Sequence, residues 1–163
     1  MELGCGSGPN LVNIIRYFKG KQIGGVDINP EAIALANKTF NGGVFQVSPL
    51  DNIMMSDKST DISLTDMTLI YIGGRRIKAH LKEIKRITRD YVVLCEFHSE
   101  SWWDRSVLWL KTGYFAHNYK KLLNKLDFYD IKYIKMPKEA WPDDPLQDKF
   151  RFVIVAKLPP RDV

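Results

Sequence analysis

The sequence predicts an α/β fold in which helices cover both faces of a doubly wound, mostly parallel sheet. Short apolar runs alternate with amphipathic segments over the first hundred residues. Residues 91–97 form a nearly continuous apolar run, which is typical of a strand buried on both faces of a parallel sheet. Residues 128–136 and 150–157 alternate apolar and polar side chains instead, which predicts an antiparallel C-terminal strand pair.

The first half of the chain is expected to contain three strands and two helices. Only residues 1–3 precede a glycine-rich turn, where a strand of about five residues is usual, so we expect a truncated first strand. Asn29 and Pro30 supply the N-cap and first-turn residues of the second helix. The predicted elements are a strand at 1–3, a helix between Gly8 and Gly20, a strand at 23–28, a helix ending near Thr39 and a strand at 44–47.

The second half is expected to complete the sheet. Residues 101–114 are aromatic and show no clear helical or strand period, so we predict an irregular stretch there, and we expect residues 101–119 to form a mobile lid over the end of the strand at 91–97. The remaining elements are strands at 61–65 and 91–97, helices at 75–89 and 118–126, and strands at 128–136 and 150–157 with a proline-enforced loop between them.

Composition limits the class of protein. A length of 163 residues fits a single domain over 1–163, which we expect to be truncated at its N-terminus. Lys and Arg exceed Asp and Glu by 24 − 19 = 5, which permits anionic partners without indicating a dedicated nucleic-acid arm. Two cysteines cannot form a disulfide framework, and neither a membrane span nor the ligand set of a metal site is evident. We therefore expect a cytoplasmic protein without a metal.

The strongest motif lies at the very start. Glu2-Leu3-Gly4-Cys5-Gly6-Ser7-Gly8 joins the first strand to the first helix, and Asp27 follows nineteen residues after Gly8 at the end of the next strand. A dinucleotide fold also uses glycines and a distal acid, but its spacing is G-x-G-x-x-G. Here the spacing is G-x-G-x-G and an acid precedes the first glycine, which favours a ligand with cationic groups and no pyrophosphate.

These residues resemble a known family. ELGCGSG followed by GVDINPEAI is similar to the first two motifs of the class I S-adenosylmethionine-dependent methyltransferases, in particular to methyltransferase domains of types 11 and 25. Residues 61–72 are similar to the fourth-strand segment of the same family. The resemblance implies a Rossmann-like fold and S-adenosylmethionine as cofactor. Residues 69–72 and 90–97 also resemble methylases of sugar biosynthesis.

The resemblance further implies a cofactor site at the carboxyl ends of the strands. Asp27 is expected to bind the ribose hydroxyls, since its two oxygens accept both protons, and Ile28 to lie against the adenine. Ser48 stands where the family commonly has an acid at the adenine pocket, and Leu50 follows it. The implied cofactor-binding residues are Glu2, Gly4, Gly6, Gly8, Asp27, Ile28, Ser48, Leu50 and Thr65.

Candidates for catalysis are less specific. Methyl transfer needs a positioned acceptor and, for some acceptors, removal of a proton. We expect His98 to face the transferred methyl as base, with Tyr71 and Asp66 near it; His117 and Glu96 are alternatives, and His80 has no assigned role. Each of these residues has a structural alternative, as a packed or solvated side chain.

The expected reaction is methyl transfer from S-adenosylmethionine to an oxygen or nitrogen of a small polar metabolite, with a sugar derivative as one option. One rival is an RNA methyltransferase that uses the basic helix at 75–89. A non-catalytic S-adenosylmethionine-binding module is another rival. We also expect that homodimerisation compensates for the short first strand.

Overall fold

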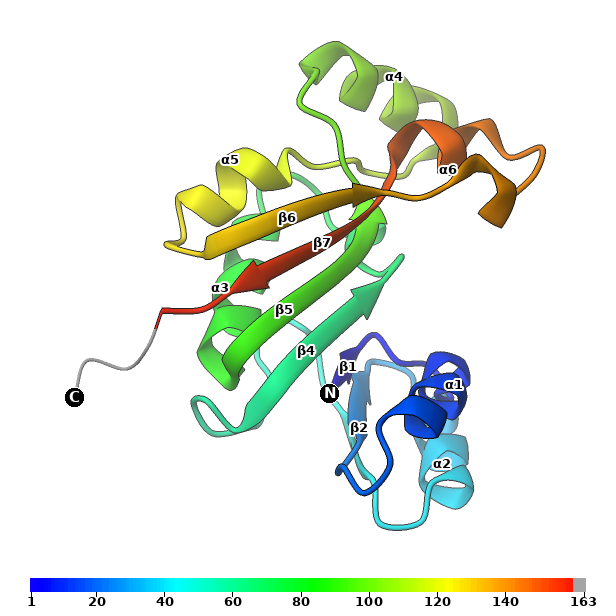
Figure 1. Ribbon diagram of the computed structural model, residues 1–163, viewed down its shortest axis with the longest axis vertical. Coiled ribbons are helices and arrows are strands. Elements are labelled where there is room, and N and C mark those ends of the chain that lie inside the picture. Colours follow the sequence, from blue (N-terminus) through cyan, green and yellow to red (C-terminus); the bar gives the residue numbers. More distant parts are fainter. Residues whose placement is uncertain (160–163) are drawn as a thin grey trace.

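A seven-stranded sheet forms the centre of the computed structural model, which describes residues 1–159 (Figure 1). The strand order is β3-β2-β1-β4-β5-β7-β6; β1 to β5 run parallel, and β7 is antiparallel to both of its neighbours. The strands are β1 (Glu2–Leu3), β2 (Gly24–Asp27), β3 (Val44–Val47), β4 (Thr60–Asp66), β5 (Thr88–Phe97), β6 (Tyr129–Lys135) and β7 (Arg151–Lys157). The predicted doubly wound, mostly parallel sheet with an antiparallel C-terminal strand is confirmed.

Six α-helices and two 3₁₀ turns connect the strands. Asn29 begins the second helix as predicted, because its side chain accepts hydrogen bonds from Glu31 N and Ala32 N at 2.9 and 3.3 Å. The helices are α1 (Pro9–Tyr17), α2 (Pro30–Thr39), α3 (Ile77–Ile87), α4 (Trp102–Thr112), α5 (Tyr119–Asn124) and α6 (Pro145–Phe150), with η1 (Leu69–Tyr71) and η2 (Lys138–Ala140).

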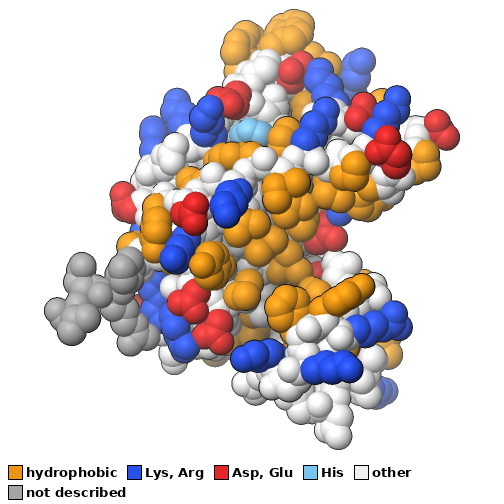
Figure 2. Space-filling model, in the orientation of Figure 1, with side chains coloured by type: hydrophobic (Ala, Val, Ile, Leu, Met, Phe, Trp, Pro, Cys, Tyr) orange, Lys and Arg blue, Asp and Glu red, His pale blue; other side chains and the backbone are white. Residues whose placement is uncertain are grey.

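Each face of the sheet has its own core. On one face, α3 and α5 bury the alternate positions Val92, Leu94 and Ile154, all of which are inaccessible to solvent. On the other face, α1 and α2 pack around Leu11 and Phe40. This second pair of helices lies over β1, β2 and β3, and hydrophobic side chains gather on the uncovered part of the same face, over β4, β5 and β7 (Figure 2). They include Ile62, Leu64, Val93, Val153 and Val155.

The prediction of an irregular stretch at 101–114 is wrong, because α4 occupies most of it. Ser101 caps this helix by accepting a hydrogen bond from Asp104 N at 3.2 Å, and Gly113 ends it in the left-handed conformation. Leu108 is the one fully buried member, whereas Trp102 and Trp103 stay exposed. Because large aromatic side chains stand on the exposed side of α4, its apolar residues do not follow the helical period by which the sequence would reveal a helix.

Other boundaries moved by a few residues. The helix predicted at 75–89 is shorter, because residues 88–97 already form β5. His80, which has no assigned role, is buried in α3, and its Nδ1 lies 3.0 Å from Arg76 O. The loop predicted between the last two strands contains η2 and the six-residue α6. Within residues 1–159 no helix is long and apolar enough to cross a bilayer.

Candidate active site

The chain reverses direction across the sheet between β1 and β4. Connections lead from β1 outward to β2 and β3, and then return to β4 on the other side of β1. In open α/β sheets, ligands bind outside the carboxyl ends of the strands at such a switch point. The turn that follows β1 lies there, and so does the end of β4 at Asp66.

The glycine turn has a backbone that other residues adopt poorly. Gly4, Gly6 and Gly8 have φ values of 76°, 52° and 87°, in the left-handed region that favours glycine. A Cβ on Gly4 would lie 2.3 Å from a Thr68 carbon, and one on Gly8 would lie 2.5 Å from the Phe40 ring. No atom lies within 4 Å of a Cβ built on Gly6, so the turn leaves open space above this residue for close approach of a ligand.

Asp27 holds the glycine turn and the start of α2 together. Its Oδ2 accepts a hydrogen bond from Gly6 N at 2.8 Å, and its Oδ1 accepts one from Asn29 N at 2.9 Å. Each carboxylate oxygen has a further lone pair, and the residue is only half-buried, so both oxygens keep an acceptor site for a ligand's hydroxyl groups. Ile28, the next residue, is 72% exposed.

A cluster of polar side chains lies beside this turn. Asn10, in the first turn of α1, donates to Glu2 Oε1 at 2.8 Å and to Asp66 Oδ2 at 3.2 Å. Glu2 is 2% exposed and its Oε2 has no hydrogen-bond partner among the described residues. Burial, together with the nearby Asp66 and Asp27 carboxylates, raises the pKa of Glu2 to about 7.

Arg151, at the start of β7, balances the charge of Asp66. Its Nη2 lies 2.6 Å from Asp66 Oδ1, and its Nη1 donates to Gln147 Oε1 at 3.2 Å. The Trp141 ring lies 3.9 Å from the guanidinium carbon. Sequence reasoning missed this residue, although an arginine in line with Val153 and Val155 on one face of an alternating strand is a recognisable signal.

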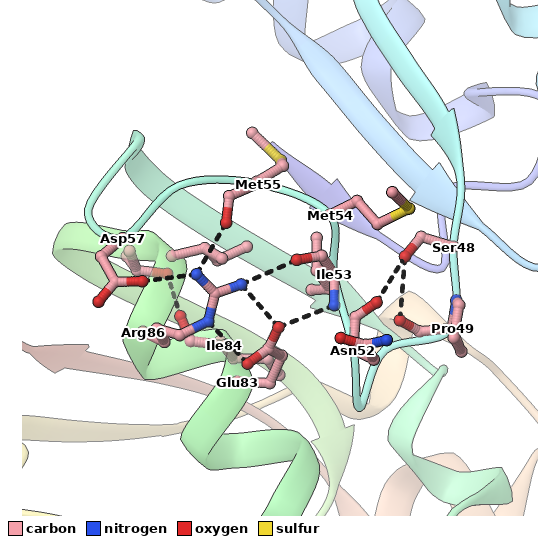
Figure 3. Close-up of polar contacts among 12 residues, drawn as sticks. Ser48, Pro49, Asn52, Ile53, Met54, Met55, Asp57, Glu83, Ile84 and Arg86 are labelled. Carbon is pink, nitrogen blue, oxygen red and sulfur yellow. Dashed lines mark hydrogen bonds and ion pairs between the residues drawn. The ribbon is translucent and has the colours of Figure 1, made fainter.

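The loop after β3 is fixed from behind by one arginine (Figure 3). The Arg86 guanidinium donates to the carbonyl oxygens of Ile53 and Met55 at 2.8 and 2.7 Å, and to the carboxylates of Glu83 and Asp57. Glu83 in turn accepts from Ile53 N at 2.8 Å. These bonds join the loop to α3 and determine its path.

Two residues expected at the adenine pocket lie in this loop. The Ser48 hydroxyl is buried and faces the carbonyl oxygens of Pro49 and Asn52 at 3.3 and 3.0 Å, as Figure 3 shows. Leu50 is 7% exposed and belongs to the main hydrophobic core. Met54, at 76%, is an exposed large hydrophobic side chain of this loop.

Glu96 supports the segment that follows β4. Its Oε1 accepts from the backbone N–H groups of Thr68 and Leu69 at 3.0 and 3.1 Å, which fixes the start of η1. Its Oε2 is buried beside Thr65 and has no hydrogen-bond partner in residues 1–159. Burial raises the pKa of Glu96 to about 7. The chain enters this segment through Met67, whose φ of 51° is strained for a side-chain-bearing residue.

The segment after β4 also contains Tyr71, on the open side of the switch point. It ends η1, is 62% exposed, and packs edge-on against Tyr114 with ring centroids 5.6 Å apart. Phe115 N donates to Ile70 O at 2.8 Å, which brings the segment after α4 beside η1. The segment after α4 therefore lies beside η1, whereas a mobile lid at 101–119 stays a prediction.

The two candidate histidines, His98 and His117, pack against aromatic rings. His98 is 7% exposed and stands among the rings of Tyr119, Tyr133 and Phe152, at centroid distances of 5.2 to 6.2 Å. Its Nδ1 lies 3.2 Å from Tyr119 N, which donates to it. Burial lowers the pKa of His98, and it lowers the pKa of His117 to about 4, so both imidazoles are mainly neutral at pH 7.

The residues present fit S-adenosylmethionine. The open space over Gly6 admits a ligand chain, and the paired oxygens of Asp27 suit the two hydroxyls of a ribose. The unpartnered Glu2 Oε2 suits a cationic group such as the α-ammonium of the methionine part. In residues 1–159 no group of three or more His, Cys, Asp or Glu side chains is arranged to hold a metal ion.

Comparisons with known proteins agree with this geometry. A family model described as a methyltransferase domain matches residues 1–91. A protein-lysine N-methyltransferase of Saccharolobus islandicus is 31% identical over 119 residues, which cover 71% of this chain and 73% of that protein.

Two solved structures share the fold. One is a SAM-dependent methyltransferase of Methanosarcina mazei, with a TM-score of 0.73 and 20% identity over 98% of this chain and 92% of that one. The other is the magnesium protoporphyrin IX methyltransferase of Synechocystis PCC 6803 with bound SAM, with a TM-score of 0.67 and 14% identity over 97% of this chain and 68% of that one.

The fold and the comparisons together define a transferase with a doubly wound sheet that uses a nucleoside cofactor. The chain belongs to the family of S-adenosylmethionine-dependent methyltransferases. The family and cofactor implied by the glycine motif and Asp27 are thereby confirmed, whereas the roles of individual site residues stay predictions.

Proposed function

We propose that this chain methylates a primary amine, the side chain of a lysine in a protein. The observation that carries the proposal is the open aromatic surface at the acceptor side, where Tyr71 exposes 62% of its area next to the end of β4. An exposed aromatic ring attracts an alkylammonium group and its aliphatic stem. The similarity to a protein-lysine N-methyltransferase supports this choice over the small polar metabolite expected from the sequence.

The chemistry assigns separate tasks to the two sides of the switch point. S-adenosylmethionine, when bound, would supply an electrophilic methyl group: a neutral amine in line with the C–S bond would gain the methyl as that bond breaks, and the thioether S-adenosylhomocysteine would leave. Residues Glu2, Gly4, Gly6 and Asp27 hold the cofactor, and Tyr71 with Tyr114 receives the acceptor. A lysine amine has a pKa near 10.4, so most of it must lose a proton before it reacts.

The position of His98 favours a packing role over that of base. Three aromatic rings surround it, and its contacts with backbone groups are those of the segment 117–119. We propose instead that the amine loses its proton to solvent on the open acceptor side. Asp66 belongs to the cofactor side, because Asn10 and Arg151 hold its two oxygens.

The alternative of an RNA methyltransferase loses support, because part of the basic helix is engaged in contacts within the chain. Three basic residues of the segment 75–89 make contacts within the chain: Lys85 Nζ with Leu126 O, Arg86 with the loop at 53–57, and Arg89 with Asp61. A homodimer and a cytoplasmic location stay predictions.

The test supplies isotopically labelled S-adenosylmethionine with three host fractions: proteins, small molecules and RNA. We expect label in the proteins, at a lysine identified by mass spectrometry, and no transfer when that lysine is replaced by arginine in the acceptor. Tyr71→Phe should retain turnover, whereas Tyr71→Ala should raise KM for the acceptor by about two- to fivefold, the value of a cation–π contact at an exposed site. Label confined to small molecules would refute the lysine assignment and favour a metabolite, and label in RNA would favour the basic helix.

A further inference from the structure

Arg151 connects two parts of the chain that are distant in sequence. Through its Nη2 it pairs with Asp66 at the end of β4, and through its Nη1 and ring contact it holds Gln147 and Trp141 of the segment 137–150. The arginine is 7% exposed, and its Nε has no hydrogen-bond partner among the described residues. A buried, charged side chain that spans these two parts is expected to fix their relative position.

The pair also acts on the carboxylates around the glycine turn. Asn10 links Asp66 to Glu2, and burial leaves Glu2 Oε2 without a partner. Two linked carboxylates repel each other unless a cation is nearby. Arg151 supplies that cation to Asp66 on the side away from Asn10, so Glu2 Oε2, at the other end of the cluster, stays available to a cationic group of a ligand.

We infer that Arg151 is a positioning residue for the amino-acid end of S-adenosylmethionine. Arg151 orients Asp66 so that Asn10 and Glu2 can bind the α-ammonium group. Through Trp141 it also holds the segment 137–150 beside the amino-acid end of the cofactor. The inference rests on the cofactor and not on the identity of the acceptor. It assigns no contact to the adenosine part, which Asp27 serves from the other side of the glycine turn.

Two ligands separate these parts of the cofactor. S-adenosylhomocysteine carries adenosine, thioether and amino acid, whereas 5′-methylthioadenosine lacks the amino acid. Arg151→Lys keeps a positive charge but loses the planar contact with Trp141 and the paired donors. By calorimetry, we expect S-adenosylhomocysteine to bind Arg151→Lys about tenfold or more weakly, and 5′-methylthioadenosine to change by less than about twofold.

A matched control exists at the other end of the sheet. Arg89 pairs with Asp61 at 2.6 Å, so Arg89→Lys alters the same kind of ion pair far from the glycine turn, and both ligands should bind it as they bind the wild type. An equal loss of both ligands in Arg151→Lys would show a merely structural role and overturn the inference. Unchanged binding of both ligands would also overturn it.

Asp66→Asn keeps the inference testable if Arg151→Lys does not fold. Asp66 is only partly buried, and the asparagine keeps one oxygen for Asn10. The variant should show the same selective loss of S-adenosylhomocysteine, and equal losses of both ligands would refute the inference. Where both single variants fold, the double variant should lose little more than Asp66→Asn alone, because Arg151 acts through Asp66. Fully additive losses would contradict this dependence.

Discussion

Replacing Asp27 with alanine tests how the cofactor's ribose is held. The change removes both carboxylate oxygens next to the glycine turn, which also accept hydrogen bonds from Gly6 N and Asn29 N. Hydrogen bonds to a charged group contribute about 1.5–3 kcal/mol each. Loss of one such bond to a ribose hydroxyl weakens binding by about tenfold, and loss of two by about a hundredfold or more. Asp27→Asn keeps one oxygen and should fall between these limits.

The assay is calorimetric titration with S-adenosylhomocysteine and with 5′-methylthioadenosine. Both contain the ribose, so Asp27→Ala should weaken both by at least about tenfold, unlike Arg151→Lys. Thermal melting checks that the variant is folded at the assay temperature.

Asn29→Ala is the matched control. It removes the cap of α2, at a cost of about 1 kcal/mol in stability, while its backbone N–H still binds Asp27. This control should bind both ligands within about twofold of the wild type. Unchanged affinity of a folded Asp27→Ala variant for both ligands would refute the assignment of the ribose to Asp27.

Three further outcomes follow from buried and bonded groups. Arg86→Ala should lower the free energy of unfolding by about 2–4 kcal/mol in urea titrations, because several charged hydrogen bonds to the loop at 53–57 are lost; a change below about 0.5 kcal/mol would contradict that role. Burial raises the pKa of Glu2 and of Glu96 from 4.5 to about 7 in the folded chain. Between these two pH values the folded state therefore binds more protons than the unfolded state. The free energy of unfolding then falls as pH rises from about 4.5 to 7, by on the order of 3 kcal/mol for each group. Glu96→Gln should remove the contribution of Glu96 to this decrease of unfolding free energy with pH. An unchanged pH dependence would show that Glu96 is not the titrating group. His98→Asn should lower the melting temperature and change turnover by less than about threefold, whereas a loss near a hundredfold would restore the imidazole as base.

The sequence by itself determined the fold class, whereas the cofactor was implied by the resemblance of its glycine motif and Asp27 to a known family. Glycines at positions 4, 6 and 8, an acid at 27 and apolar runs of strand length are local features, and local backbone preference and periodicity express them directly. The N-cap at Asn29 and the antiparallel alternation of the last two strands are local in the same sense. For this reason the doubly wound, mostly parallel sheet with its antiparallel C-terminal strand could be inferred before any contact was known.

The tertiary structure alone decided which polar residues meet. Arg151 lies 85 residues from Asp66, and Asn10 lies 56 residues from it, so no local pattern joins them. Ser48, Leu50 and His98 lie at the expected ends of strands, yet packing turned their side chains toward backbone carbonyls, the hydrophobic core and an aromatic cluster. The pattern of α4 failed for a related reason, because its largest apolar side chains are exposed. A side chain's direction depends on free energies of burial and pairing that distant segments supply, and these are settled only when the segments pack together.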